Sequence, residues 1–178
     1  MKEKKFLIVV DMQNDFIDGA LGTKEAVAIV DAAAERIRTC REEGYRIIAT
    51  LDTHGENYLD TAEGQKLPVR HCIRGTDGWQ INPKIMKALG DSILLEKPTF
   101  GSTRLPELVR SGLDPEDRLL IEVLGLCTDI CVVSNVLLLK THFPEARIMV
   151  NTECCAGVTP AKHEAALETM RSCQIDMI

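Results

Sequence analysis

Hydrophobic residues along this chain gather in six short and almost continuous runs. The runs lack the alternation of half-exposed strands, and longer stretches with helical spacing or turn residues separate them. Continuous apolar runs of this length are typical of parallel strands that are buried on both faces. The six predicted strands are Phe6–Val10, Arg46–Leu51, Ser92–Leu95, Leu119–Leu124, Arg147–Val150 and Gln174–Ile178.

The stretches between the strands predict helices. The clearest apolar stripe lies between the first two strands and consists of Ile29, Ala33, Ile37 and Cys40. Gly44 follows as the candidate C′ residue, the first residue after this helix. Asn82-Pro83 opens a shorter helix that Gly90 ends, and Thr159-Pro160 opens the last one. Alternating strands and helices predict an α/β fold, a three-layer α/β/α arrangement with a mostly parallel six-stranded sheet, in one domain spanning residues 1–178.

Composition narrows the class of protein. The 178 residues suit one domain, and a formal net charge of −6 without any Lys/Arg run argues against a nucleic-acid partner. No apolar run is long enough to span a membrane, and Phe6–Val10 is too short for a signal sequence. We therefore expect a cytoplasmic protein. Its seven cysteines fit no disulfide or zinc-finger spacing, so we expect them to be reduced, with the adjacent Cys154 and Cys155 structural.

Ionisable residues stand at the carboxyl ends of four predicted strands. Asp11 ends the first strand, Asp52 ends the second, and the third runs through Glu96 into Lys97. The fourth leads through a glycine to Cys131. Ligands of open α/β sheets bind at this edge, so these side chains are expected to face one site.

Cys131 is the candidate nucleophile, because it lies near the amino end of a predicted helix, where main-chain N–H groups and the helix dipole favour a thiolate. A buried structural cysteine is the alternative. Asp11 is a candidate base for the thiol proton, and Lys97 could hold both partners in their charged forms. Taken singly, Asp11 is also consistent with a turn or capping residue and Lys97 with a solvated surface lysine.

A second cluster lies in the long polar segment between Asp52 and Gln80, whose irregular pattern suggests a functional loop. In the pattern Asp52-x-His54 both side chains point to the same side of a strand. Two imidazoles and one or two carboxylates suit Zn²⁺, Mn²⁺ or Fe²⁺, whereas two unrelated loop histidines are the alternative. We interpret the remaining histidines, His142 and His163, as surface or capping residues. The candidate ligands are Asp52, His54, Glu63 and His71.

Five motifs, in order along the whole chain, resemble the isochorismatase-like cysteine hydrolases and, within them, the nicotinamidases. They are Asp11-Met12-Gln13-Asn14-Asp15-Phe16, Asp52-Thr53-His54, His71-Cys72-Ile73-Arg74-Gly75-Thr76, Glu96-Lys97-Pro98-Thr99-Phe100-Gly101-Ser102 and Gly125-Leu126-Cys127-Thr128-Asp129-Ile130-Cys131.

The resemblance implies a role for each residue of the first site. Cys131 would be the nucleophile, Asp11 the base and Lys97 its charged partner. The main-chain N–H groups of Cys127 and Cys131 would form the oxyanion hole, helped by a cis peptide between Leu126 and Cys127. Such a bond before a non-proline residue is costly and needs a functional reason.

The resemblance also implies a divalent metal, Zn²⁺ in the first place, on Asp52, His54 and His71. Glu63 occupies the position of a fourth ligand that some nicotinamidases have. Other branches, such as the isochorismatases and the ureido or biuret hydrolases, generally lack this cluster. The chain departs from the pattern at Pro68, where many nicotinamidases carry an aromatic residue that stacks on the substrate ring.

The expected reaction is hydrolysis of nicotinamide to nicotinate and ammonia through a thioester, in NAD salvage. Phe16 and Phe100 are the expected contacts of the substrate ring. One alternative keeps the same triad and changes the substrate to another small amide, ureide or carbamoyl compound. Another is a flavodoxin-like module that uses Cys131 as a redox sensor or binds a nucleotide, but no glycine-rich phosphate motif follows the first strand. We expect a small-molecule amide as partner, no membrane or nucleic acid, and leave a homo-oligomer open.

Overall fold

All strands of the central sheet run parallel in the computed structural model, which describes residues 2–178. Within this range the sheet has six strands in the order β3-β2-β1-β4-β5-β6. The prediction of a six-stranded parallel sheet is therefore confirmed. The strands are β1 (Glu3–Val10), β2 (Arg46–Asp52), β3 (Ile93–Lys97), β4 (Arg118–Leu126), β5 (Arg147–Ala156) and β6 (Asp176–Met177).

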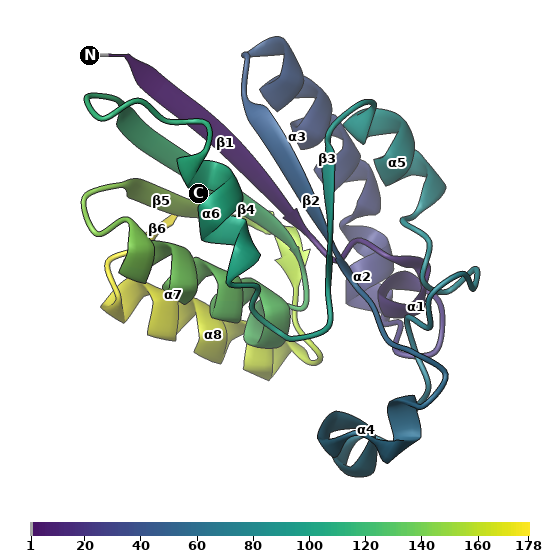
Figure 1. The fold of residues 1–178 in the computed structure, drawn as a ribbon. Coiled ribbons are helices and arrows are strands. Elements are labelled where there is room, and N and C mark those ends of the chain that lie inside the picture. The colour runs from purple at the N-terminus through teal and green to yellow at the C-terminus, as the bar shows by residue number, and fades with distance from the viewer. Residues whose placement is uncertain (1) are drawn as a thin grey trace.

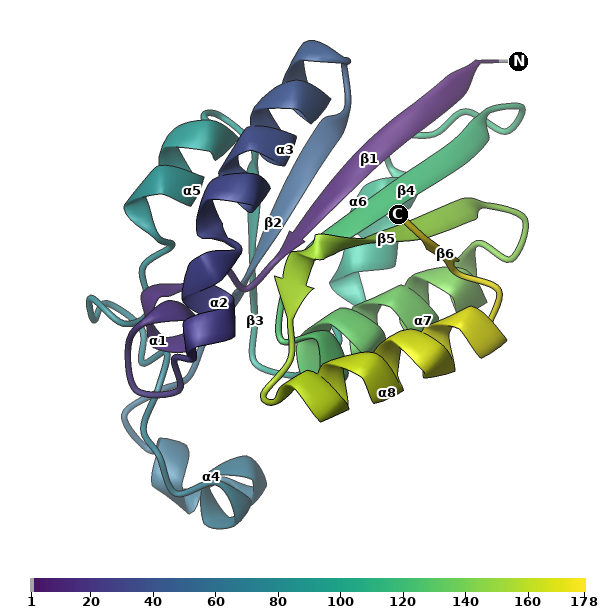
Figure 2. The same ribbon diagram turned by 180° about the vertical axis from the view of Figure 1, so that it is seen from behind.

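Helices cover both faces of this sheet, which gives the predicted three layers (Figures 1 and 2). One face carries α2 (Lys24–Ala28), α3 (Val30–Glu42) and α5 (Pro83–Leu89), and the other carries α6 (Arg104–Arg110), α7 (Val133–His142) and α8 (Pro160–Ser172). Short segments follow the strand ends: α1 (Asn14–Ile17), η1 (Tyr58–Asp60), α4 (Ala62–Lys66) and the π-helical turn η2 (Thr128–Val132). Among residues 2–178, no helix has the length and apolar character needed to cross a membrane.

Local sequence signals explain several of these elements. Three residues of the predicted stripe, Ala33, Ile37 and Cys40, have fully buried side chains, and Ile29 is half-buried at the N-cap of α3. The Thr159 hydroxyl accepts a hydrogen bond from the Lys162 N–H, as expected of an N-cap residue. Gly44 has a φ of 78°, the left-handed conformation that ends helices.

Several predicted boundaries needed correction. Strand β5 continues well beyond Val150, because its buried end, which includes Cys154 and Cys155, pairs with β4 after a register shift. Strand β6 is shorter than predicted, since Gln174 adopts a positive φ of 66° and breaks the extended chain. The segment between Asp52 and Gln80, predicted to be irregular, contains η1 and α4. Helical structure also begins before Cys131 rather than after it.

The junction of β1 and β4 positions the site. These two strands are neighbours in the middle of the sheet, and the chain order reverses between them, which is where open α/β sheets bind ligands. Gly125 lets the two strand ends meet: its φ is 125°, and a Cβ atom there would lie 2.2 Å from the carbonyl oxygen of Val10. The residues after each strand, Asp11 and Cys127, are thereby brought to one crevice.

Candidate active site

Lys97 lies at the centre of a buried triad. Its Nζ is 2.7 Å from Oδ2 of Asp11 and 3.3 Å from Sγ of Cys131, and it donates to the carbonyl oxygen of Thr99 at 3.1 Å. The side chains of Lys97 and Asp11 are fully buried, and Cys131 is 5% exposed. The three residues that the sequence placed at strand ends therefore meet in space.

Main-chain geometry and Thr50 hold Asp11 in place. Asp11 has a φ of 48°, and its N–H donates to the carbonyl oxygen of Thr50 on the neighbouring strand. The Thr50 hydroxyl donates to Oδ1 of Asp11 at 2.6 Å. Apart from its ion pair with Lys97, Oδ2 accepts no hydrogen bond among the described residues. This oxygen is therefore available as an acceptor for a proton from the thiol.

Burial and the neighbouring charges determine the protonation of the triad. Burial raises the pKa of Asp11 above its ordinary value, although the Lys97 ammonium opposes the shift. Burial alone would lower the pKa of Lys97, but the negative charge of Asp11 outweighs it and raises that pKa. Burial and Asp11 together raise the pKa of Cys131 well above that of a free thiol. The resting site thus contains a lysine ammonium and a cysteine thiol.

The turn that carries Cys131 has an unusual main chain. The peptide bond between Leu126 and Cys127 is cis, as the family resemblance implies, and the π-helical turn η2 follows it. The side chain of Asn135 donates to the carbonyl oxygen of Cys131 at 2.8 Å and accepts from the N–H of Ser102 at 3.0 Å. This fully buried amide connects the turn that carries Cys131 to the loop after β3.

The four predicted metal ligands also lie together. Their ligand atoms are all within 4.8 Å of one another, a spacing that allows them to hold one divalent ion. Nε2 of His54 is 3.0 Å from Oδ2 of Asp52 and 3.8 Å from Oε1 of Glu63, and Nε2 of His71 is 3.5 Å and 3.8 Å from the same two atoms. Two imidazoles and two carboxylates form a donor set suited to Zn²⁺, Mn²⁺ or Fe²⁺.

Asp52 joins the metal cluster to the triad. Its Oδ2 faces the two histidines, whereas its Oδ1 is 3.7 Å from Nζ of Lys97. Burial alone would raise the pKa of Asp52, but hydrogen bonds from the histidines and the charge of Lys97 lower it strongly. The carboxylate is therefore ionised and available to a cation.

Two polar residues of the first motif position this cluster through contacts that no sequence pattern indicated. Gln13 is fully buried; its side chain accepts from the N–H of Asp52 at 2.7 Å and donates to the carbonyl oxygen of Asp52 at 2.8 Å. Oδ2 of Asp15 accepts from the N–H of Cys72, next to His71. The motif therefore contains the candidate base and also orients two candidate ligands.

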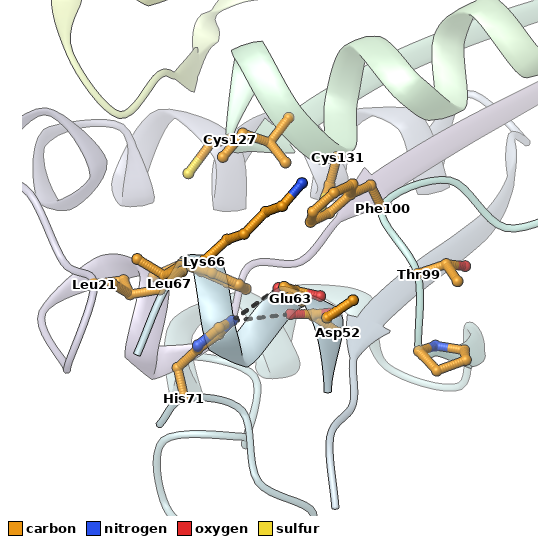
Figure 3. Close-up of a pocket in the computed structure, with 14 residues that line it drawn as sticks. Leu21, Asp52, Glu63, Lys66, Leu67, His71, Thr99, Phe100, Cys127 and Cys131 are labelled. Atoms are coloured by element: carbon orange, nitrogen blue, oxygen red, sulfur yellow. Dashed lines mark ion pairs between the residues drawn. The ribbon is translucent and has the colours of Figure 1, made fainter. Parts of the chain in front are cut away.

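A pocket of about 420 Å³ opens onto both clusters (Figure 3). Its walls include Phe16 and Phe100, as predicted, but their settings differ: Phe16 is 8% exposed and Phe100 is 48% exposed. The ring of Phe16 meets that of His71 edge to face, with centroids 5.5 Å apart. Pro68 is not among the lining residues, and the pocket wall in this segment is formed by Lys66 and Leu67.

The prediction for His163 as a surface or capping residue was wrong in its detail. His163 is half-buried on α8, and its Nδ1 lies 2.8 Å from Oγ1 of the fully buried Thr128. One residue further along, Asp129 accepts a hydrogen bond from the N–H of Val158. The start of α8 is thus attached to the turn that carries Cys131.

Comparisons with known proteins agree with this fold. The isochorismatase domain family matches residues 5–178. The nicotinamidase of Escherichia coli is 31% identical, over 90% of this chain and 86% of that protein. The nicotinamidase/pyrazinamidase of Mycobacterium tuberculosis is 25% identical, over 97% of each. The crystal structure of a pyrazinamidase of Pyrococcus horikoshii in complex with zinc superposes with a TM-score of 0.82, at 28% identity and over 98% of both chains.

A doubly wound parallel sheet with cysteine, aspartate and lysine at its switch point is the arrangement of a cysteine hydrolase with a three-layer α/β/α fold. The match extends from the first strand to the last residue. The chain belongs to the isochorismatase family.

Proposed function

We propose that this protein hydrolyses nicotinamide to nicotinate and ammonia and so serves NAD salvage. One observation carries the proposal: Cys131 of the buried triad and three of the four metal donors, Asp52, Glu63 and His71, line the same pocket. The similarity to nicotinamidases over almost the whole chain supports it. The proposal treats residues 1–178 as one hydrolase domain.

In the first half of the reaction, Asp11 takes the proton of the Cys131 thiol through the acceptor oxygen Oδ2. The sulfur attacks the carboxamide carbon, and the carbonyl oxygen becomes an oxyanion facing the main-chain N–H groups of Cys127 and Cys131. One such donor typically contributes roughly 3 kcal/mol to transition-state stabilisation. Asp11 then passes the proton to the leaving nitrogen, ammonia departs, and the acyl group remains on the sulfur as a thioester.

In the second half, Asp11 removes a proton from a water molecule that attacks the thioester carbon. The tetrahedral species collapses, the bond from carbon to sulfur breaks, and the acid is released, its carboxyl proton passing to solvent to give nicotinate. The proton on Asp11 returns to the Cys131 sulfur. Throughout the cycle the Lys97 ammonium stays within reach of both partners, so that negative charge is stabilised on whichever of them carries it.

The donor set of Asp52, His54, Glu63 and His71 fits a divalent cation, and we propose Zn²⁺. A bound ion would supply a Lewis-acid site for the ring nitrogen of the substrate. Phe16 would contact the ring from the buried side of the pocket, and the more exposed Phe100 would contact it near the mouth.

All seven cysteines are free thiols, which supports a reducing compartment such as the cytoplasm. The expectation that the protein binds neither nucleic acids nor membranes stays a prediction, and a homo-oligomer stays open.

The test is ammonia release from nicotinamide by the purified protein, with and without a chelator and beside a Cys131→Ala variant. We expect release that needs both the cysteine and the metal. Bound metal without turnover of nicotinamide would contradict the proposed substrate and point to another heteroaromatic amide. Absence of both would favour a ureido-type substrate.

A further inference from the structure

Lys66 is a cation at the pocket that neither the triad nor the metal cluster uses. It lies in the last turn of α4, a short helix that extends from the body of the protein beyond the carboxyl ends of the strands (Figures 1 and 2). Figure 3 shows its side chain running along the pocket, with the amine directed toward the end where Cys127 and Cys131 lie. Across residues 2–178, no carboxylate forms an ion pair with it.

The nearest acidic residue on the same helix, Glu63, does not pair with Lys66. Glu63 precedes Lys66 by three residues on the same helix, a spacing at which opposite charges commonly pair. Oε1 of Glu63 instead faces Nε2 of His54 and of His71, 3.8 Å from each. The two charges of α4 therefore point to different parts of the pocket: the carboxylate to the metal donors and the ammonium to the reacting end (Figure 3).

Charge balance leaves Lys66 as the unpaired charge of the loaded site. The two carboxylates of the metal cluster, Asp52 and Glu63, match the charge of one divalent ion. Asp11 and Lys97 neutralise each other within the triad. Lysine side chains carry a positive charge at neutral pH. A pocket that held only neutral amides would have no group to pair with this ammonium.

The walls around Lys66 strengthen any such pairing. Leu21, Leu67 and Ile130 line the same pocket, and the surface that the lining exposes is mainly apolar. Apolar walls exclude water and lower the local dielectric constant, so that opposite charges attract more strongly than in bulk solvent. Lys66 is itself exposed, so a carboxylate at the reacting end of the pocket would meet one preplaced cation beside these apolar walls.

We propose that Lys66 is a specificity-determining residue that binds a ligand carboxylate at the reacting end of the pocket. The identity of the ring rests on the proposed function, but the carboxylate subsite does not. Two sources share this chemistry: the acid that the hydrolysis releases, and an acidic substituent beside the carboxamide of the substrate. In the first case the pocket holds its product more tightly than the neutral amide. In the second it prefers carboxylated amides.

The test is calorimetric titration of the zinc-loaded Cys131→Ala protein, which cannot form a thioester, with nicotinamide and with nicotinate. The measured quantity is the ratio of the two dissociation constants, acid over amide. We expect Lys66→Gln to raise this ratio about tenfold at low ionic strength, Lys66→Glu to raise it further, and Lys66→Arg to keep it. Lys87→Gln, an exposed lysine on α5, is the matched control and leaves the ratio unchanged.

A second ligand separates the two sources. Nicotinamide with a carboxylate at ring position 4, beside the carboxamide and away from the ring nitrogen, is titrated into the same variants. Loss of affinity for nicotinate alone assigns Lys66 to the product, and loss for the carboxylated amide alone assigns it to a substrate substituent. If the dissociation constants of both acidic ligands, each divided by that of nicotinamide, are the same in Lys66→Gln as in the parent protein, the proposed carboxylate subsite is overturned.

The result can be read even if the proposed function fails. Turnover of nicotinamide is measured on the wild-type protein in a separate assay. If it is absent, the same titrations are run with benzoate and benzamide, a pair that lacks the ring nitrogen. A change of their ratio in Lys66→Gln retains the carboxylate subsite, and an unchanged ratio overturns it. Added salt should reduce the effect in the parent protein and leave Lys66→Gln unaffected.

Discussion

Two hydrogen bonds join the side-chain amide of Gln13 to the main-chain N–H and carbonyl groups of Asp52. The bonds measure 2.7 and 2.8 Å, and Gln13 is fully buried. Since Asp52 faces Lys97 through one oxygen and the metal donors through the other, this contact sets the position of both clusters. Gln13 is also two residues from Asp11, so a short turn connects the base to the metal site.

Replacing Gln13 should therefore impair both clusters together. We expect Gln13→Ala to lower activity and metal affinity by about 10- to 100-fold, the usual effect of removing a residue that orients a ligand. It should also lower the free energy of unfolding by about 1–3 kcal/mol, because buried main-chain groups lose their partner. Activity, metal content and urea unfolding are measured beside Gln80→Ala, an exposed control. Unchanged metal affinity would contradict the positioning role.

Removal of the metal should separate the two clusters. We expect Glu63→Gln to weaken metal binding and turnover, while iodoacetamide still alkylates Cys131 at the rate seen in the parent protein. The reason is that Glu63 contacts the histidines, whereas the triad is held by its own ion pair. Asp52→Asn should alter both properties, since Asp52 contacts Lys97 as well. Equal alkylation rates in both variants would show that Asp52 does not support the triad.

The pH dependence should reveal the buried base. Burial raises the pKa of Asp11 above its ordinary value of 3.8. The reaction needs the carboxylate form, so kcat/KM is retained above this raised pKa and is lost as the pH falls through it. We expect an acid limb above pH 3.8 whose apparent pKa belongs to the coupled triad. Metal content is checked at each pH, and an acid limb at or below 3.8 would exclude Asp11 as a desolvated base.

Sequence reasoning succeeded where the signal is local. The cap at Thr159 and the stripe of Ala33, Ile37 and Cys40 depend on neighbours along the chain, and both are present. The residues at strand ends also converged as expected, because parallel strands all place their carboxyl ends at one edge. The chemistry that a residue can contribute at that edge depends on its side-chain type and on the strand that it follows. Both can be read from the sequence.

The missed features depend on contacts between distant segments. The bonds from Gln13 to Asp52 and from His163 to Thr128 join residues 39 and 35 positions apart. No periodicity or spacing reports such a pair. Helix α4 was missed for another reason: it has only five residues, and one is Gly64, whose added Cβ would lie 2.0 Å from the carbonyl oxygen of Tyr58. Tight packing requires glycine at this position, and because glycine is a poor helix former, the sequence does not predict the helix.

Stability should depend on the ion pair that joins β4 of the sheet to helix α3. Glu122 on β4 is fully buried; its oxygens accept from Nε and Nη2 of Arg36 at 2.8 and 2.6 Å and from the amide of Asn151 at 3.2 Å. Glu122→Ala leaves the arginine without its partner, so we expect a loss of about 3–5 kcal/mol in unfolding free energy, the range for a broken buried pair. Urea titration measures it, and a loss below about 1 kcal/mol would contradict a structural role.

The contact of His163 with Thr128 should influence the chemical step. Thr128 follows Cys127, whose N–H is a proposed oxyanion donor, and His163 is the side chain that fixes its hydroxyl at 2.8 Å. His163→Ala frees this hydroxyl and should let the turn shift, which affects the transition state more than the bound substrate. We therefore expect kcat to fall about tenfold with little change in KM.

The conservative variant distinguishes positioning from general damage. In His163→Asn, the side-chain amide lies near the place of Nδ1 and can bond to the Thr128 hydroxyl, so kcat should recover toward the parent value. His142→Ala, at the end of α7, is the histidine control and should leave kcat unchanged. Steady-state kinetics and thermal unfolding are recorded for all three. A rise in KM with unchanged kcat in His163→Ala, or failure of asparagine to restore kcat in a stably folded protein, would rule out the proposed route through Thr128.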